Sequence, residues 1–323
     1  MTTSPAPPPE PAAATAGAPA ATGAATYDAV TAVRGRSQWE IFWRRLRRHK
    51  LGMIGLVGLI LIILAAIIGP ILSPYQFDTV DVSQLNQAPS WSHPFGTGEL
   101  GQDELTRVLL AGRVSLQVGL LTALVASLVG TTLGLIAGFL GGLADSGISR
   151  LTDLFLAAPS LVVLIVIGLT FESIGLLEII FILALLSWMP LTRIVRASAL
   201  SLKQREFVQA AQAMGASRTR ILFRHLLPNS VAEIIVFATL TVGIAIVTEA
   251  TLSFLGLGIN PARQPSWGNL ISTQQENVLA GQYWWLTVFP GMFIVLTVLF
   301  VNFLGDALRD ALDPHGVHFE GKD

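Results

Sequence analysis

Six long apolar segments constrain the fold of this chain more than any other feature. They cover approximately residues 51–72, 114–140, 151–171, 174–192, 231–255 and 284–305. Each is close to the roughly 20 apolar residues that an α-helix needs to cross a bilayer. Hydrophobic residues make up 52% of the sequence and charged residues 13%, with a mean hydropathy of +0.63, which excludes an ordinary soluble domain. The sequence therefore predicts an all-α polytopic membrane protein with six transmembrane helices.

The distribution of lysine and arginine predicts how the chain is oriented. Of the 20 basic residues, 17 precede the first span, follow the sixth, or lie in the loops after the second and fourth spans. Only Arg107, Arg113 and Arg263 fall on the opposite side. Because basic residues are enriched on the cytoplasmic side of membranes, both termini and the loop 193–228 are predicted to be cytoplasmic. The expected location is a cell membrane.

Composition divides the chain further. Residues 1–33 are rich in Ala, Pro and Thr, carry no basic residue, and are predicted to be a disordered cytoplasmic tail. A basic amphipathic start and the first helix occupy 34–72, and an external segment occupies 73–111. A five-helix core over 112–314 and a cytoplasmic tail over 315–323 complete the expected organisation. The chain has no cysteine, so neither disulfide nor thiolate chemistry is available to it.

Glycines and prolines predict how the spans pack. Four glycines spaced by four residues are expected on one face of the second span, where small residues let helices approach closely; lining of a substrate path is the alternative. They are Gly130, Gly134, Gly138 and Gly142. Pro159 and Pro290 are expected to kink their spans. Arg150 and Asp153, three residues apart on one helix, are expected to form an ion pair. The third and fourth spans are expected to form a tight hairpin around 172–174.

The basic loop after the fourth span contains a second periodic pattern. Apolar residues recur at helical spacing from about residue 205 to 214, so a short helix with one small apolar face is expected. That face comprises Phe207, Ala210, Ala211 and Met214. Gly215 can adopt the left-handed conformation that ends this helix, and Ser217 can cap a second helix that runs through Leu227. Two interpretations remain open: the hairpin inserts into a groove of a partner protein, or it rests on anionic lipid.

This loop resembles the "EAA" loop through which permease subunits of ATP-binding-cassette (ABC) importers dock onto their ATPases. The family pattern is Glu-Ala-Ala, three residues, Gly, and a later Leu-Pro. Its positions are occupied here by Gln209-Ala210-Ala211, Gly215 and Leu227-Pro228, so Gln209 replaces the glutamate. The resemblance implies a set of ATPase-coupling residues, namely Glu206, Phe207, Gln209, Ala210, Ala211, Met214, Gly215, Arg218, Arg224, Leu227 and Pro228.

Other stretches narrow the resemblance to permeases of dipeptide, oligopeptide and nickel importers, over about residues 40–314. The matching stretches are His93–Asp103, Arg107 with Gly112–Ser115, the positions Asp145, Arg150, Asp153 and Pro159-Ser160, then Glu249–Gly258, Trp267-Gly268 and Gly305–Pro314. The departures are Gly98 and Gln102, where the family pattern has Asp and Arg. The chain is most similar to the "C" member of the permease pair in dipeptide importers. The resemblance implies a helical bundle of the type I importer permease kind.

Residues suited to catalysis are scarce. None of the three lysines follows a G-x-x-x-x-G pattern, so the chain has no phosphate-binding loop of its own and is not expected to be an enzyme. Glu249 lies within the fifth span, where an ionised group is unfavourable unless it is paired or faces water. It is expected either to line a translocation path or to form a buried hydrogen bond that fixes a helix end.

The resemblance implies a bacterial transport subunit that forms half of a pore for di- and oligopeptides. Its expected partners are a homologous second permease, two cytoplasmic ATP-binding subunits, an external substrate-binding protein, membrane lipid and the peptide itself, with no nucleic acid. No metal or cofactor is expected in this chain, since ATP and Mg would be bound by the ATPases. Nickel import is the alternative within the family, and a proton-coupled secondary carrier is the alternative from a different class.

Overall fold

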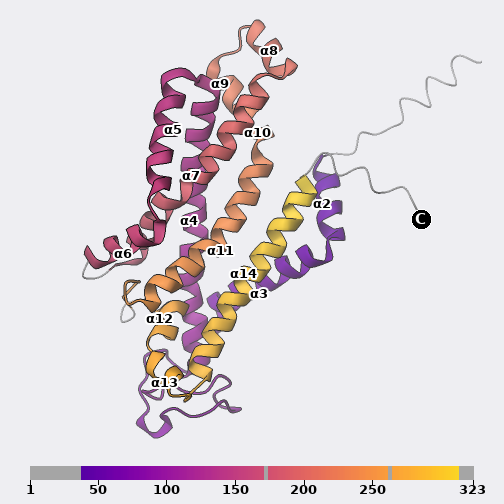
Figure 1. Ribbon diagram of the computed structural model, residues 1–323. Coiled ribbons are helices and arrows are strands. Elements are labelled where there is room, and N and C mark those ends of the chain that lie inside the picture. Colours follow the sequence, from indigo (N-terminus) through magenta and orange to yellow (C-terminus); the bar gives the residue numbers. More distant parts are fainter. Residues whose placement is uncertain (1–37, 171–173, 261–263, 313–323) are drawn as a thin grey trace, which may run out of the picture. The chain divides into compact units, whose positions relative to one another are not determined.

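The computed structural model describes residues 38–170, 174–260 and 264–312 of the chain (Figure 1). The chain divides into two units, Met1–Ile41 and Phe42–Asp323, and the second contains nearly all of the described residues. Apart from two isolated β-bridges, the regular structure of the described ranges is helical. The prediction of an all-α fold is confirmed.

The predicted spans correspond to long helices. Among the described residues, five helices are long and apolar enough to cross a membrane: α3 (Lys50–Leu72), α4 (Glu104–Leu140), α7 (Leu176–Lys203), α11 (Val231–Phe254) and α14 (Trp285–Leu312). A sixth span results if the bent pair α5 (Gly142–Ala157) and α6 (Ser160–Thr170) counts as one. The shorter elements are α2 (Gln38–Arg48), η1 (Val82–Gln84), α8 (Glu206–Ala213), α9 (Arg218–Ile221), η2 (Leu222–Leu226), α10 (Leu227–Asn229), α12 (Trp267–Ser272) and α13 (Gln275–Leu279). The predicted tails 1–33 and 315–323 lie outside the described residues.

The third span departs from the expected single helix over 151–171. Helical structure begins earlier, at Gly142, and breaks before Pro159, where α5 and α6 meet at an angle of 77°. Proline disfavours the helical conformation of the residue before it, and Ala158 is accordingly extended, with φ −85° and ψ 134°. The kink expected at Pro159 is therefore confirmed, and it is sharp enough to divide the span. Of the turn expected around 172–174, residues 172 and 173 lie outside the described residues.

Helices α4 and α7 pack closely along the predicted glycine face. A Cβ atom built on Gly130, Gly134 or Gly138 would lie within 2.7 Å of an atom of α7, so only glycine permits this approach. Gly142 has open space around it and lies beyond the end of α4. The packing interpretation is therefore confirmed for the first three glycines.

A second packed region lies where α3, α4, α11, α12 and α14 meet. Its largest fully buried side chain is Trp267, whose Nε1 donates a hydrogen bond of 2.9 Å to the carbonyl of Val108. Glycines again set the helix spacing, because a Cβ atom on Gly55 or Gly58 of α3 would overlap Phe300 of α14. This region fixes α12 against the end of α11.

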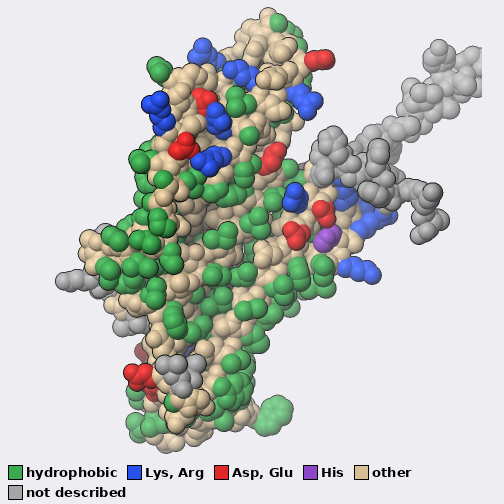
Figure 2. All heavy atoms as spheres, in the orientation of Figure 1, with side chains coloured by type: hydrophobic (Ala, Val, Ile, Leu, Met, Phe, Trp, Pro, Cys, Tyr) green, Lys and Arg blue, Asp and Glu red, His purple; other side chains and the backbone are tan. Residues whose placement is uncertain are grey.

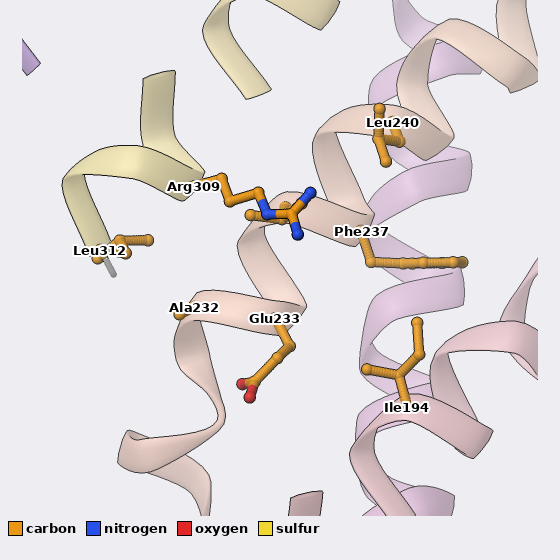
Figure 3. A pocket seen from close by; sticks show the side chains of 8 residues that line it. Ile194, Ala232, Glu233, Phe237, Leu240, Arg309 and Leu312 are labelled. Carbon is orange, nitrogen blue, oxygen red and sulfur yellow. The ribbon is translucent and has the colours of Figure 1, made fainter. Parts of the chain in front are cut away.

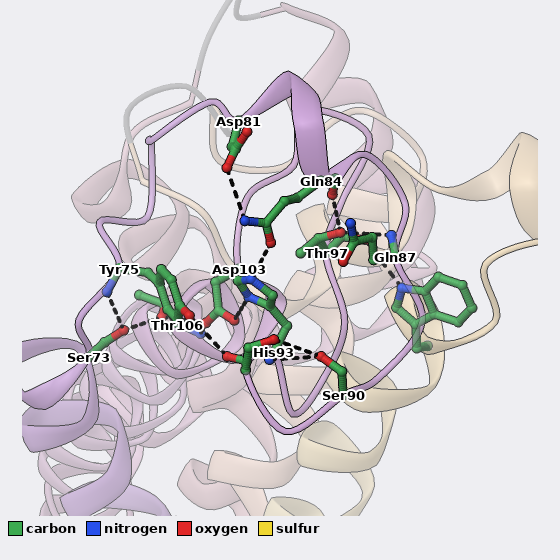
Figure 4. A network of polar contacts seen from close by, with 12 residues as sticks. Ser73, Tyr75, Asp81, Gln84, Gln87, Ser90, His93, Thr97, Asp103 and Thr106 are labelled. Atoms are coloured by element: carbon green, nitrogen blue, oxygen red, sulfur yellow. Dashed lines mark hydrogen bonds and ion pairs between the residues drawn. The ribbon is translucent and has the colours of Figure 1, made fainter.

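Residues 73–103, termed the outer segment, are held by a buried polar network at the start of α4 (Figure 4). His93 is 4% exposed and lies between two acceptors: its Nδ1 is 2.9 Å from Asp103 Oδ1 and its Nε2 is 2.6 Å from Gln84 Oε1. The Gln84 amide nitrogen donates to Asp81 at 3.1 Å, which turns its oxygen toward the ring. Both ring nitrogens of His93 therefore have a hydrogen-bond partner inside the outer segment. The Ser83 hydroxyl, donating to the Asp81 carboxylate, holds the pKa of that carboxyl below its usual range.

Asp103 also determines where α4 begins. Its Oδ2 accepts a hydrogen bond from the backbone N–H of Thr106 at 2.9 Å and caps the helix. For this reason α4 starts at Glu104, earlier than the apolar segment 114–140 indicates. Gly101, at φ +72°, completes the outer segment, since a Cβ atom there would overlap the backbone carbonyl of Asp81.

Candidate coupling site

The loop between α7 and α11 folds into two short helical arms, termed the hairpin (residues 205–229). The first arm is α8, close to the predicted bounds of 205–214. Gly215 has φ +80°, and the N–H of Ala216 donates to the Ala211 carbonyl at 3.0 Å, which closes the end of the helix. Ser217 then caps α9, its side chain accepting from the N–H of Arg220 at 3.3 Å. Both predicted helix boundaries are confirmed.

The second arm is not a uniform α-helix. Residues Leu222–Leu226 form a π-helix, η2, between α9 and α10. Pro228 has no N–H to donate to the carbonyl of Arg224 four residues earlier, so the regular α-helical ladder cannot continue through it. A π-turn immediately before the proline is one way to absorb that defect. The sequence predicted a helix through Leu227 and not this distortion.

The hairpin has a small core of its own. Val208 of α8 and Leu226 of η2 are completely buried, and Ile221 of α9 is 2% exposed. They pack in one cluster with Phe139 of α4 and Val195 of α7. The hairpin is thus anchored to the ends of the spanning helices and is not a loose loop.

The exposed face of the hairpin is more aromatic than predicted. Phe207 is 45% exposed, Met214 is 82% exposed, and Ala210 is also exposed. Ala211 is only 5% exposed, so the expectation that all four residues share one accessible face is wrong at that position. Ala211 lies on the side of α8 that faces the hairpin core, as Val208 does one turn earlier. Phe223, 65% exposed on η2, adds an apolar side chain that the periodic pattern of α8 alone does not reveal.

The polar residues implied by the family resemblance lie around this face. Glu206, Arg218 and Arg224 are exposed, and Figure 2 shows Lys and Arg side chains gathered at this end of the spanning helices. The Gln209 amide donates to the Gln204 carbonyl at 3.3 Å, within the chain itself. At the end of the hairpin, Leu227 is partly buried and Pro228 is exposed. The hairpin therefore combines apolar side chains with a rim of basic charge.

Glu249 lies far from the hairpin, in a buried polar cluster between α11 and α12. It has no exposed surface, and its Oε1 accepts hydrogen bonds of 2.7 Å from both Ser253 and Ser266. Ser266 is also the N-cap of α12, in a reciprocal capping arrangement with Asn269. Glu249 therefore joins the end of α11 to the start of α12. This geometry favours the second of the two interpretations, a buried hydrogen bond that fixes a helix end.

The prediction of an ion pair between Arg150 and Asp153 is wrong. Asp153 instead pairs with Arg193 of α7, Nη2 to Oδ1 at 2.5 Å, and Asp145 of α5 pairs with Arg196 of α7. Sequence spacing favoured a partner on the same helix, but α5 and α7 run side by side (Figure 1) and present partners from across the interface.

A cavity of about 360 Å³ opens where α11 leaves the hairpin, between α7, α11 and the end of α14 (Figure 3). Its charged lining residues are Glu233 and Arg309, and the rest of the lining is apolar: Ile194, Ala232, Val236, Phe237, Leu240 and Leu312. Sequence patterns do not reveal this cavity, because it joins residues that are far apart in the chain. Among the described residues, no group of three His, Asp or Glu side chains is placed to hold a metal ion.

Comparison with known proteins identifies the family. Residues 130–315 match the binding-protein-dependent transport system inner membrane component family, and residues 37–89 match the N-terminal TM domain of oligopeptide transport permease C. The chain is 40% identical over 279 residues to the oligopeptide transport system permease protein OppC of Bacillus subtilis, covering 86% of this chain and 90% of that protein. It is 43% identical over 272 residues to the dipeptide transport system permease protein DppC of the same organism, covering 84% of each.

A third relative is the glutathione transport system permease protein GsiD of Shigella flexneri, 40% identical over 280 residues, covering 86% of this chain and 91% of that protein. Family match and relatives agree with the helical architecture and with the spans described above. This chain therefore belongs to the family of inner membrane components of binding-protein-dependent transport systems, the multi-pass permease subunits of ABC importers.

Proposed function

We propose that this chain forms half of the translocation pore of an ATP-driven importer of short peptides and couples to its ATPases through the hairpin. The observation that carries the coupling role is the exposure of three apolar side chains, Phe207, Met214 and Phe223, on a hairpin whose own core is already packed; these three residues are termed the hairpin tip. Exposed aromatic residues supported by a rigid base suit insertion into a protein groove. The basic rim alone would equally suit a lipid surface, which is the competing interpretation.

The peptide substrate is supported by the relatives, whose names refer to oligopeptide, dipeptide and glutathione transport. Glutathione is itself a small peptide, so all three substrates belong to one chemical class. These relatives favour peptide import over the nickel alternative. They also argue against a proton-coupled carrier acting alone, because they are subunits of transport systems.

The proposed complex contains a homologous second permease, two cytoplasmic subunits that bind ATP and Mg, and an external binding protein that delivers the peptide. In this arrangement both termini and the hairpin are cytoplasmic, and the outer segment faces the binding protein. The chain itself hydrolyses nothing. Closure of the ATPases would displace the hairpin, whose attachment to α4 and α7 would pass the motion to the helix bundle and switch it between outward-open and inward-open packings.

Reconstitution into proteoliposomes tests this function. The chain with its partner permease, ATPases and binding protein should take up a radiolabelled tripeptide only when ATP is supplied on the hairpin side. The chain alone should neither hydrolyse ATP nor transport. Uptake by the single chain, driven by a proton gradient, would overturn the proposal in favour of a carrier.

The orientation can be tested separately. Since the chain has no cysteine, Gln87→Cys introduces a single thiol, and it should react with a membrane-impermeant maleimide added outside cells. Labelling of Gln87→Cys from the cytoplasmic side only would contradict the proposed topology.

A further inference from the structure

Helix α5 is separated from its neighbours in sequence by a break at each end. Gly141, between α4 and α5, and Gly142, the first residue of α5, have φ +68° and +58°, and a Cβ atom on either would meet no atom within 4 Å. Two successive residues in this conformation turn the chain sharply, and nothing packs against the positions that their side chains would occupy. At the other end, Pro159 separates α5 from α6 at 77°. The position of α5 is therefore set by side-chain contacts and only weakly by chain connectivity.

Besides the edge-to-face contact of Phe155 with Trp188, two ion pairs join α5 to α7, and together these ion pairs are termed the clamp. Arg196 donates to Asp145 through two nitrogens, Nε to Oδ1 and Nη2 to Oδ2, the second at 2.8 Å. Two parallel N–H···O bonds of this kind fix orientation as well as distance. Arg193 donates to Asp153 through one nitrogen at 2.5 Å.

The two pairs differ in exposure. The side chains of Arg196 and Asp145 are 34% and 22% exposed, whereas those of Arg193 and Asp153 are 56% and 63% exposed. Solvent and salt screen the second pair more strongly. Asp145 with Arg196 is therefore the stronger half of the clamp.

Helix α7 connects the clamp to the hairpin. From Arg196 to the end of α7 at Lys203 the helix is uninterrupted, a length of about 10 Å at 1.5 Å per residue. Lys203 in turn donates to the carbonyl of Phe139 at 2.8 Å, and the hairpin core begins three residues later with α8. A displacement of the hairpin therefore reaches Arg196 and Arg193 through a stiff element.

We propose that Asp145, supported by Asp153, is a positioning residue that transfers movement of the hairpin from α7 to the bent pair α5–α6, and so couples ATP hydrolysis to peptide passage. This inference rests on the proposed function. Without the clamp, α5 and α7 are joined mainly by the apolar contact of Phe155 with Trp188, so α5 can follow the movement of α7 less closely and pivot on its glycine hinge. The ATPases then cycle and the bend at Pro159 follows only in part.

The test compares uptake per ATP hydrolysed in proteoliposomes that contain the whole complex. Asp145→Asn should preserve ATP hydrolysis stimulated by the binding protein but lower tripeptide uptake per ATP by at least about fivefold, the lower end of typical coupling energies. Asp153→Asn, the matched control, should lower the ratio less. Exchanging the charges, Asp145→Arg with Arg196→Asp, should restore it.

A ratio unchanged in Asp145→Asn would overturn the inference. So would equal losses of uptake and hydrolysis together with a lower melting temperature, because that is the result expected of a contact that only stabilises the fold. If Asp145→Asn fails to assemble, Asp145→Asn with Arg196→Gln leaves no unpaired charge and must show the same low ratio. A wild-type complex without ATP-dependent uptake would instead refute the proposed function, so the two failures are distinguishable.

Discussion

The outer segment and the hairpin are both turns between spanning helices, but they are built in opposite ways. The outer segment directs its polar groups inward: His93, Asp103 and Thr97 are buried and bonded to one another or to the backbone. The hairpin buries only a few apolar residues and leaves Phe207 and Met214 in solvent. The first is a self-sufficient structure, whereas the second is stable yet presents a surface that none of the residues described by the structure covers. The difference is the one expected between a scaffold and the proposed docking element.

The largest expected effect lies in the outer segment. Asp103→Ala leaves the buried His93 without one hydrogen-bond partner, which costs about 1–3 kcal/mol. It also removes the cap of α4, which costs about 0.5–2 kcal/mol more. Thermal unfolding of the purified complex, followed by tryptophan fluorescence, should show a clear drop in melting temperature. Asp81→Ala, at the accessible edge of the same network, is the control and should shift it much less. If the two variants lowered the melting temperature equally, the buried Asp103 would contribute no more to stability than the exposed Asp81.

Two glycines sharpen the comparison, because both have positive φ but different surroundings. Gly101→Val adds a clash with the backbone of Asp81 to the backbone strain and should destabilise the protein by about 2–5 kcal/mol. Gly215→Val meets open space and should lose only the strain of about 1–2 kcal/mol. The Gly215→Val variant should still insert into the membrane. It should no longer co-purify with the ATPases, because the altered turn changes the direction in which the hairpin tip points. If Gly215→Val showed normal co-purification and normal uptake, the hairpin would not be the coupling element.

A neighbouring pair of alanines gives the smallest but most specific contrast. Ala211→Trp overpacks the hairpin core and should cost about 1–3 kcal/mol, visible as faster proteolysis of the loop 193–228. Ala210→Trp places the same bulk in solvent and should leave proteolysis unchanged while weakening ATPase association. The ranking would fail if Ala210→Trp were the variant that exposed the loop.

These pairs show what sequence reasoning could reach in this chain. Spans and helix caps were predictable, since apolar length and residues such as Ser217 and Gly215 act locally. The side of α8 on which Ala211 lies was not, because helical periodicity predicts a stripe but not which edge meets the core. The ion-pair partner of Asp153, Arg193, could not be predicted either, because this contact depends on α5 and α7 lying side by side. Sequence spacing could not locate the π-turn either, though Pro228 gave a reason to expect some distortion.

The functional assignment likewise rests partly on the sequence and partly on the three-dimensional structure. The family could be inferred from ordered motifs spread along the chain, whereas the role of Glu249 needed the three-dimensional neighbours Ser253 and Ser266. A carboxylate inside a span is compatible with a path or with a structural bond, and only its complete burial favours the second.

The exposed hairpin tip is proposed to contact the ATPases, and site-specific cross-linking measures this contact. Because the chain lacks cysteine, Met214→Cys would carry a single thiol on the most exposed residue of the tip, and Trp91→Cys would carry one on the outer segment. With a short bis-maleimide and an ATPase bearing one thiol in its docking groove, we predict a permease–ATPase product for Met214→Cys and none for Trp91→Cys. No ATPase product at Met214, in a complex that still imports peptide, would contradict the account.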